Sequence, residues 1–136
     1  MIALTGIERY PVIVACAISA GIHAALTPSH FAEGTGAGLG FLGSAAVLGA
    51  LAAVLSRQVT AAVLLVTIAV LAGLLGSYAL AITSGVPLLH PEPEPVTGLA
   101  LFTKAVEIGG LLAALHLLRH GRPAVAPIHV WKGRLS

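Results

Sequence analysis

Charged residues are scarce in this sequence. Lysine, arginine, aspartate and glutamate make up 9% of its 136 residues, whereas a typical soluble domain contains about 25%. Hydrophobic residues reach 57%, and the mean hydropathy is +1.00. So little polar surface cannot cover a water-soluble core, and the apolar residues fall in four long blocks. The composition therefore predicts an all-α integral membrane protein.

Cysteine, aromatic residues and familiar catalytic motifs are also scarce or missing. Cys16 is the single cysteine, which excludes an intrachain disulfide and a zinc site built from cysteines, and we expect it to be a small packing residue. Aromatic residues make up 4%, too few for a surface that stacks nucleic acid bases. P-loop, dinucleotide-binding, metalloprotease and serine-hydrolase motifs do not occur. These absences favour a non-enzymatic protein that does not bind nucleic acid.

Four apolar stretches are long enough to cross a bilayer, which requires about 20 residues per helix. The expected spans cover residues 8–27, 37–56, 58–83 and 97–119. Short connections favour antiparallel neighbours, so residues 1–120 should form one four-helix transmembrane bundle, followed by a basic cytoplasmic tail at 121–136. The first span lacks a clean cleavage site after it and is interpreted as a retained helix. Pro28 is expected to end this helix, or to kink it if the helix continues.

Small residues recur every four positions in the second and third spans. The rows are Gly36, Gly40 and Ser44 in the second span and Ala69, Gly73 and Ser77 in the third. Rows of this kind let a neighbouring helix approach closely. A helix rich in alanine and glycine also produces such spacings by chance, and both interpretations are open.

The distribution of positive charge predicts the orientation. Arg57 lies between the second and third spans and, apart from Lys104, the other basic residues flank the start of the first span and the end of the fourth. The connections at residues 28–38 and 84–97 contain neither lysine nor arginine. Because positive charge is retained in the cytoplasm, both termini should be cytoplasmic and these two connections should face outward from the plasma (inner) membrane.

Histidine and glutamate gather at the outward end. His23, His30 and Glu33 are spaced by seven and three residues, which places them on one face of an unbroken helix. His90 lies in a proline-rich, extended segment and is a candidate fourth ligand. Imidazole and carboxylate groups in such a set bind divalent zinc or copper. Alternatively, His30 and Glu33 are solvated loop residues and His23 caps a helix end, or the cluster handles protons.

Lys104 and Glu107 stand inside the fourth span, where charges are costly. Three residues apart, they are neighbours on a helix surface. In one interpretation they neutralise each other as a structural ion pair. In the other they face the bundle interior and support the outward cluster through a polar network with His23, Tyr78 or Thr103.

Two stretches resemble a family of small four-helix bacterial membrane proteins whose activity is not assigned. The first is the G-x-H and P-x-H-x-x-E pattern within residues 21–33, and the second is the Gly-x-Pro at 85–87 followed by glutamates at 92 and 94. The resemblance implies a shared architecture and a shared polar site on the outward side. Lys104 departs from the pattern, because an acidic residue is expected there.

The leading hypothesis is a small multi-pass membrane protein that binds copper or zinc through its outward histidines and Glu33. Its partners would be the lipid bilayer and either a second copy or other membrane subunits. One alternative is a structural or assembly subunit of a respiratory or oxygenase-type complex. Another is a small proton-coupled transporter.

Overall fold

The computed structural model describes residues 2–3, 7–87 and 92–123, which form four helices and two very short strands. The helices are α1 (Tyr10–Glu33), α2 (Thr35–Arg57), α3 (Ala61–Thr83) and α4 (Gly98–His120). The strands β1 (Ile2–Ala3) and β2 (Arg122–Pro123) pair antiparallel, and so connect the residues before α1 to those just after α4. All four helices are long and apolar enough to cross a membrane. The predicted all-α four-helix bundle is confirmed, and the chain is a small multi-pass membrane protein.

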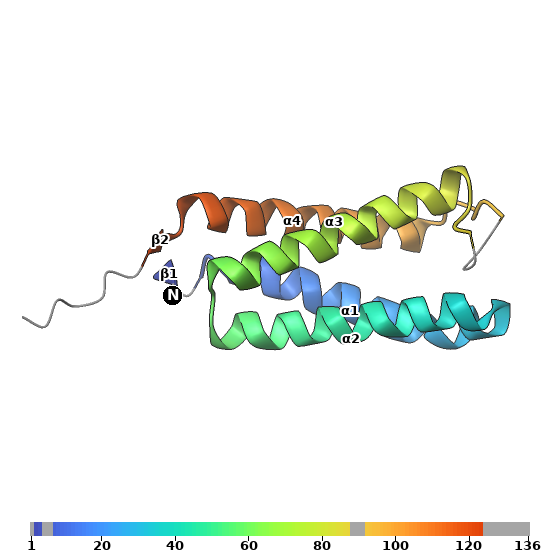
Figure 1. The fold of residues 1–136 in the computed structure, drawn as a ribbon, viewed down its shortest axis with the longest axis horizontal. Coiled ribbons are helices and arrows are strands. Elements are labelled where there is room, and N and C mark those ends of the chain that lie inside the picture. Colours follow the sequence, from blue (N-terminus) through green and yellow to red (C-terminus); the bar gives the residue numbers. More distant parts are fainter. Residues whose placement is uncertain (1, 4–6, 88–91, 124–136) are drawn as a thin grey trace, which may run out of the picture.

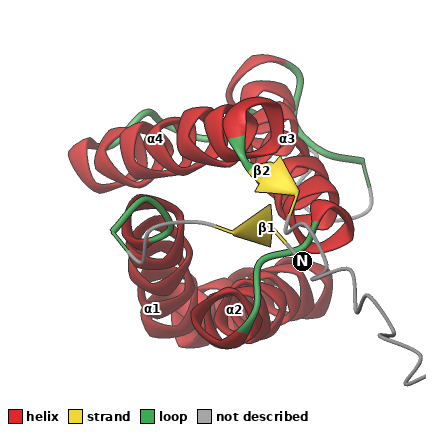
Figure 2. Ribbon diagram, turned by 90° about the vertical axis from the view of Figure 1, so that its left-hand side faces the viewer, coloured by secondary structure: helices red, strands yellow, loops and turns green. Residues whose placement is uncertain are grey.

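Successive helices run in opposite directions along the bundle (Figure 1). α1 packs extensively against α2, and α4 packs against both α1 and α3. α2 and α3 pack together much less, because α3 starts beside the end of α2 and then diverges from it (Figures 1 and 2). We call the end where α1 meets α2 and α3 approaches α4 the loop end, and the opposite end the terminal end.

The apolar core fills the terminal half of the bundle. Its fully buried members include Leu48 and Leu55 of α2 and Leu64 and Leu71 of α3, and Cys16 packs among them as expected. The loop half buries polar side chains instead. These are Ser19, His23, Thr27, Thr103 and Glu107. Lipid tails are as apolar as leucine, so hydrogen bonds and close packing, rather than water exclusion, must hold the loop half together.

α1 does not end at Pro28 but continues to Glu33. The expectation of a polar connection over residues 28–38 is therefore wrong, because Gly34 alone separates α1 from α2. Proline removes one helical hydrogen bond, and membrane helices tolerate it where nearby hydroxyls bond to the backbone. The hydroxyls on either side do bond to the backbone, Thr27 to the His23 carbonyl and Ser29 to the Leu26 carbonyl, both at 2.8 Å, but not to the Ala24 carbonyl that Pro28 leaves without its helical donor.

The connection between α3 and α4 is irregular where the structure describes it, at residues 84–87 and 92–97, as its prolines predict. Gly85 has φ 72°, a left-handed conformation that suits glycine just after a helix. The Glu94 amide donates to the Ala81 carbonyl at 2.9 Å and ties the connection to α3. Thr97 then caps α4 by accepting from the Ala100 amide at 3.2 Å. His90 lies outside the described residues.

The predicted rows of small residues are not where the described helices approach most closely. Ala69, Gly73 and Ser77 are exposed, and a Cβ added at Gly40 or Gly73 would meet nothing within 4 Å. Close approaches occur at Gly110 of α4, where an added Cβ would lie 2.6 Å from the Ala15 Cβ of α1, and at Gly38 of α2, where it would overlap the Phe31 ring of α1. A role of the predicted rows in contacts with another chain stays a prediction.

Candidate functional site

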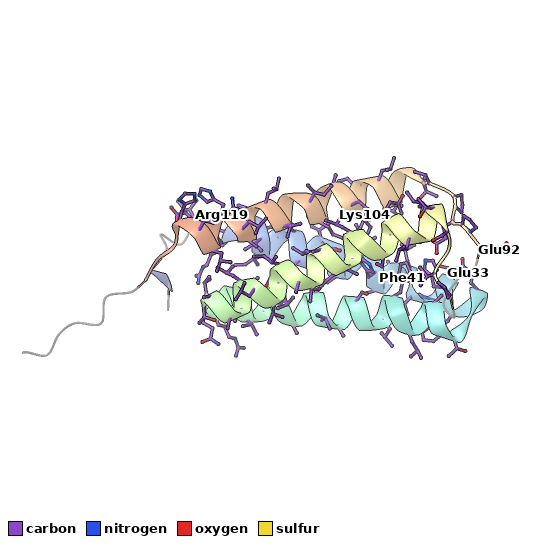
Figure 3. The ribbon with its side chains drawn as sticks, turned by 45° about the horizontal axis from the view of Figure 1, so that its top comes forward. Glu33, Phe41, Glu92, Lys104 and Arg119 are labelled. Atoms are coloured by element: carbon purple, nitrogen blue, oxygen red, sulfur yellow. The ribbon has the colours of Figure 1, made fainter. Side chains whose placement is uncertain are left out.

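A pocket of about 550 Å³ lies at the loop end, among all four helices and the connection between α3 and α4. Figure 3 shows Glu33 and Glu92 at this end, with Phe41 and Lys104 farther into the bundle. The walls of the pocket are mainly apolar. The lining residues with ionisable or aromatic side chains are His23, His30, Glu33, Phe41, Tyr78, Glu94 and Lys104. Both its volume and its few polar groups on apolar walls are typical of small-molecule sites.

A charged pair lies at the inner side of the pocket. The Lys104 Nζ lies 2.6 Å from Oε2 of Glu107, and the Lys104 side chain is 14% exposed. Glu107 has no exposed surface, and its Oε1 accepts a hydrogen bond from the Ser19 hydroxyl of α1 at 2.7 Å. Both charged residues therefore face the bundle interior. The pair and the hydroxyl reduce the cost of placing a carboxylate at this depth.

His23 is connected to this pair through Ser19. Its Nδ1 lies 2.8 Å from the Ser19 backbone carbonyl and 3.4 Å from the Ser19 hydroxyl. A carbonyl oxygen only accepts, so Nδ1 must carry a proton. In the neutral ring Nε2 is then left as an acceptor, and the histidine lines the pocket. One serine thus links an imidazole of α1 to a carboxylate of α4.

His30 stands nearer the loop end and has two partners. Its Nδ1 lies 2.7 Å from Oε2 of Glu33, one helical turn away. Its ring stacks on Phe41 of α2, with centroids 3.6 Å apart and planes 21° from parallel. The Phe41 ring also lies 5.2 Å from the ring of His23. One aromatic side chain of α2 therefore orders both imidazoles of α1.

Tyr78 of α3 completes the inner side of the pocket. Its ring centroid lies 5.4 Å from the Lys104 Nζ, within the range of a cation–π contact. Its hydroxyl oxygen is buried and has no hydrogen-bond partner among the described residues. Buried hydroxyls normally have a partner, because leaving one unpaired costs about 1–3 kcal/mol. This hydroxyl therefore has unused hydrogen-bonding capacity on a residue that lines the pocket.

The structure brings only part of the predicted metal set together. His23, His30 and Glu33 all line the pocket. In the part of the chain that the structure describes, however, no three histidine, cysteine, aspartate or glutamate side chains are grouped so that they could hold a metal ion. His90 lies outside that part, so the complete four-residue set stays a prediction.

Sequence reasoning missed two residues that support the site, Ser19 and Phe41. Ser19 is one helical turn before His23, a spacing that could have drawn attention to it. Phe41 is the lone aromatic residue of a helix built from small and aliphatic residues. Thr103, by contrast, was a candidate network partner, but its hydroxyl bonds to the Leu99 carbonyl of its own helix at 2.8 Å.

Comparisons of the chain with protein-family models, with curated proteins and with solved structures give no match. The resemblance to a family of small bacterial membrane proteins therefore stays a prediction. The site has to be interpreted from its own geometry.

Proposed function

We propose that this membrane protein binds an uncharged small molecule in the loop-end pocket, and that the molecule carries a carbonyl oxygen on an apolar body. The observation that carries the proposal is the buried hydroxyl of Tyr78, which has no hydrogen-bond partner in the described part of the chain; the ring that bears it lies 5.4 Å from the Lys104 Nζ, in a pocket with mainly apolar walls. Both groups are hydrogen-bond donors. A carbonyl oxygen is an acceptor to which either group can donate.

The charges around the pocket favour a neutral ligand. Lys104 is paired with Glu107, and Glu33 contacts His30. An anionic ligand would add an uncompensated charge at membrane depth, where charges are costly. The ammonium has three N–H groups, and its hydrogen bond to Glu107 uses one of them. The remaining N–H groups support binding of a neutral acceptor without breaking the pair.

The test is ligand-induced stabilisation in lipid nanodiscs. The probe is a decyl-substituted benzoquinone, which is an uncharged, carbonyl-bearing lipophile, and decanoate serves as the anionic comparison. A ligand that binds only the folded protein raises the unfolding temperature, and the rise grows with the logarithm of the ratio of ligand concentration to Kd. We expect the quinone to raise it and decanoate to raise it much less.

Tyr78→Phe separates specific binding from general partitioning. It removes the hydroxyl but keeps the ring, and we expect it to weaken quinone affinity about tenfold, because one hydrogen bond is lost. Tyr10→Phe is the matched control, since Tyr10 is 54% exposed and lies at the start of α1, far from the pocket. Equal quinone affinity in both variants would contradict the proposal.

A second candidate is binding of copper or zinc by His23 and His30. Both imidazoles direct Nδ1 at an oxygen, the Ser19 carbonyl in one case and the Glu33 carboxylate in the other. Metal-bound histidines have this second contact almost always, and it leaves Nε2 for the metal. Metal content of the purified protein, compared with that of His23→Ala and His30→Ala, tests the idea. Equal content in all three would remove it.

A further inference from the structure

If the proposed function holds, the divergence of α2 from α3 affects how a ligand enters the pocket and where its tail lies. We infer that the pocket opens sideways into the lipid between these two helices, and that its ligand is a lipid-tailed molecule whose head lies in the pocket while its tail passes out between α2 and α3. We call this opening the α2–α3 seam and define it by Gly40 and Ser44 on α2 and Ser77 on α3.

The seam is the open side of the bundle. α1 packs against α2, α4 packs against α1, and α3 packs against α4, whereas α2 and α3 have much less contact. Figures 1 and 2 show why: the two helices are close at the terminal end and separate toward the loop end, where the pocket lies. All three seam residues line the pocket.

The seam residues are small and leave space. Gly40 and Ser77 line the pocket and are also exposed, so they border both the pocket and the outside of the bundle. A Cβ at Gly40 would meet nothing within 4 Å. The exposed leucines nearby, Leu39 and Leu42 on α2 and Leu80 on α3, occupy other positions. An acyl or isoprenoid tail could therefore pass between the helices without displacing a large side chain.

The hydroxyl groups of the seam already have hydrogen-bond partners, so the seam can face lipid. The Ser77 hydroxyl donates to the Leu74 carbonyl at 3.0 Å, and the Ser44 hydroxyl donates to the Gly40 carbonyl at 2.8 Å. Each hydroxyl is thus satisfied by its own helix, which is how polar side chains are accommodated at membrane depth. The polar groups that would hold the head, Lys104 and Tyr78, lie within the pocket lining.

The depth of the seam places it beside hydrocarbon. Gly40 is five residues from the start of α2 and Ser77 six residues from the end of α3, which corresponds to about 7–9 Å along each helix. A helix of 23 residues is about 35 Å long, whereas the hydrocarbon layer is about 30 Å thick. If the bundle is centred in the bilayer, the seam lies below the headgroups. A molecule already dissolved in the membrane can then reach the pocket without crossing water.

The test compares two benzoquinone probes that share one head, one without a tail and one with a decyl tail, in nanodiscs. Gly40→Leu fills the seam, and Ser77→Leu does so from the other helix. Gly49→Leu is the matched control, because Gly49 is also an exposed glycine of α2 with nothing within 4 Å, but lies two and a half turns nearer the terminal end. Affinity is obtained from the rise in unfolding temperature with probe concentration.

We expect wild-type protein and Gly49→Leu to bind both probes. Gly40→Leu and Ser77→Leu should weaken binding of the decyl probe at least about tenfold more than they weaken binding of the tailless probe. Equal losses for both probes, or no loss for the decyl probe, would overturn the seam while leaving the pocket intact. If neither probe stabilises the wild-type protein, the proposed function falls and the seam with it.

Discussion

At the scale of single residues, Ser19 has a larger role than its size suggests. Its hydroxyl donates to Glu107 and its carbonyl accepts from His23, so one residue joins two ionisable groups on different helices. Without the Ser19 hydroxyl, Glu107 Oε1 would lose this hydrogen-bond donor. A buried carboxylate oxygen without a partner lowers the free energy of unfolding. The stability of the polar half of the bundle therefore depends on the alignment of α1 with α4, because Ser19 and Glu107 must face each other.

Ser19→Ala should lower the free energy of unfolding by about 1–3 kcal/mol, because it leaves a buried acceptor without a donor. Unfolding in mixed detergent micelles, followed by circular dichroism, measures the change. Ser29→Ala is the control on the same helix, since its exposed hydroxyl bonds only to the Leu26 carbonyl. If Ser19→Ala lowers the free energy of unfolding no more than Ser29→Ala does, the Ser19 hydrogen bond contributes little to stability.

The pairing of Ser19 with Glu107 also shows what the sequence could not predict. The two residues are 88 positions apart, and spacing along one helix does not reveal which residues of another helix face it. The His30–Glu33 and Lys104–Glu107 pairs were foreseeable, because each lies within one helical turn. The four apolar spans were foreseeable for a similar reason, since about 20 apolar residues in a row suffice to predict a membrane helix.

At the scale of elements, the helix ends were harder to predict than the helices. Proline and glycine usually mark boundaries in soluble proteins, which led to the expectation of a connection at residues 28–38. α1 instead passes through Pro28, and α2 begins directly after Gly34. The tight turn brings Phe31 against Gly38, where a Cβ would collide with the ring. α1 and α2 are therefore held together as a hairpin, while α3 is free to diverge.

Two adjacent glycines of α4 allow a sharp test of how closely α1 and α4 pack. Gly110→Val should destabilise the bundle by about 1–3 kcal/mol, because the new side chain would overlap Ala15 and crowd Leu71. Gly109→Val should have little effect, since a Cβ there meets nothing within 4 Å. Chemical denaturation of both variants measures the difference. Equal stability of the two would mean that α1 and α4 are less tightly packed than described.

At the scale of the whole molecule, the two halves of the bundle differ in character. Aliphatic side chains pack the terminal half, and hydrogen-bonded polar groups and the pocket occupy the loop half. The terminal end carries Arg57 and Arg119, whereas the pocket at the loop end is bordered by Glu33 and Glu94. The positive-inside rule still predicts that the loop end faces outward, so the pocket would be accessible from the exterior side of the membrane.

Cysteine labelling tests this orientation in intact cells. In a Cys16→Ala background, Pro93→Cys at the loop end should react with a membrane-impermeant maleimide. Position 93 is exposed, and the loop end is expected to face the outside of the cell. Gln58→Cys, in the exposed turn between α2 and α3, should react only after permeabilisation. The reverse pattern would invert the topology. It would leave the fold, the pocket and the proposed ligand chemistry unchanged.

The one-residue turn at Gly34 has a consequence for how the bundle is positioned in the bilayer. Glu33 ends α1 and Thr35 starts α2, on either side of Gly34. The end of α1 and the start of α2 must therefore lie at the same depth in the bilayer. The exposed Glu33 carboxylate favours water, and it therefore anchors both helices at the interface together. Extra residues inserted at this turn would release that shared anchor and let α1 and α2 slide vertically past each other, altering the depth at which the pocket meets the lipid.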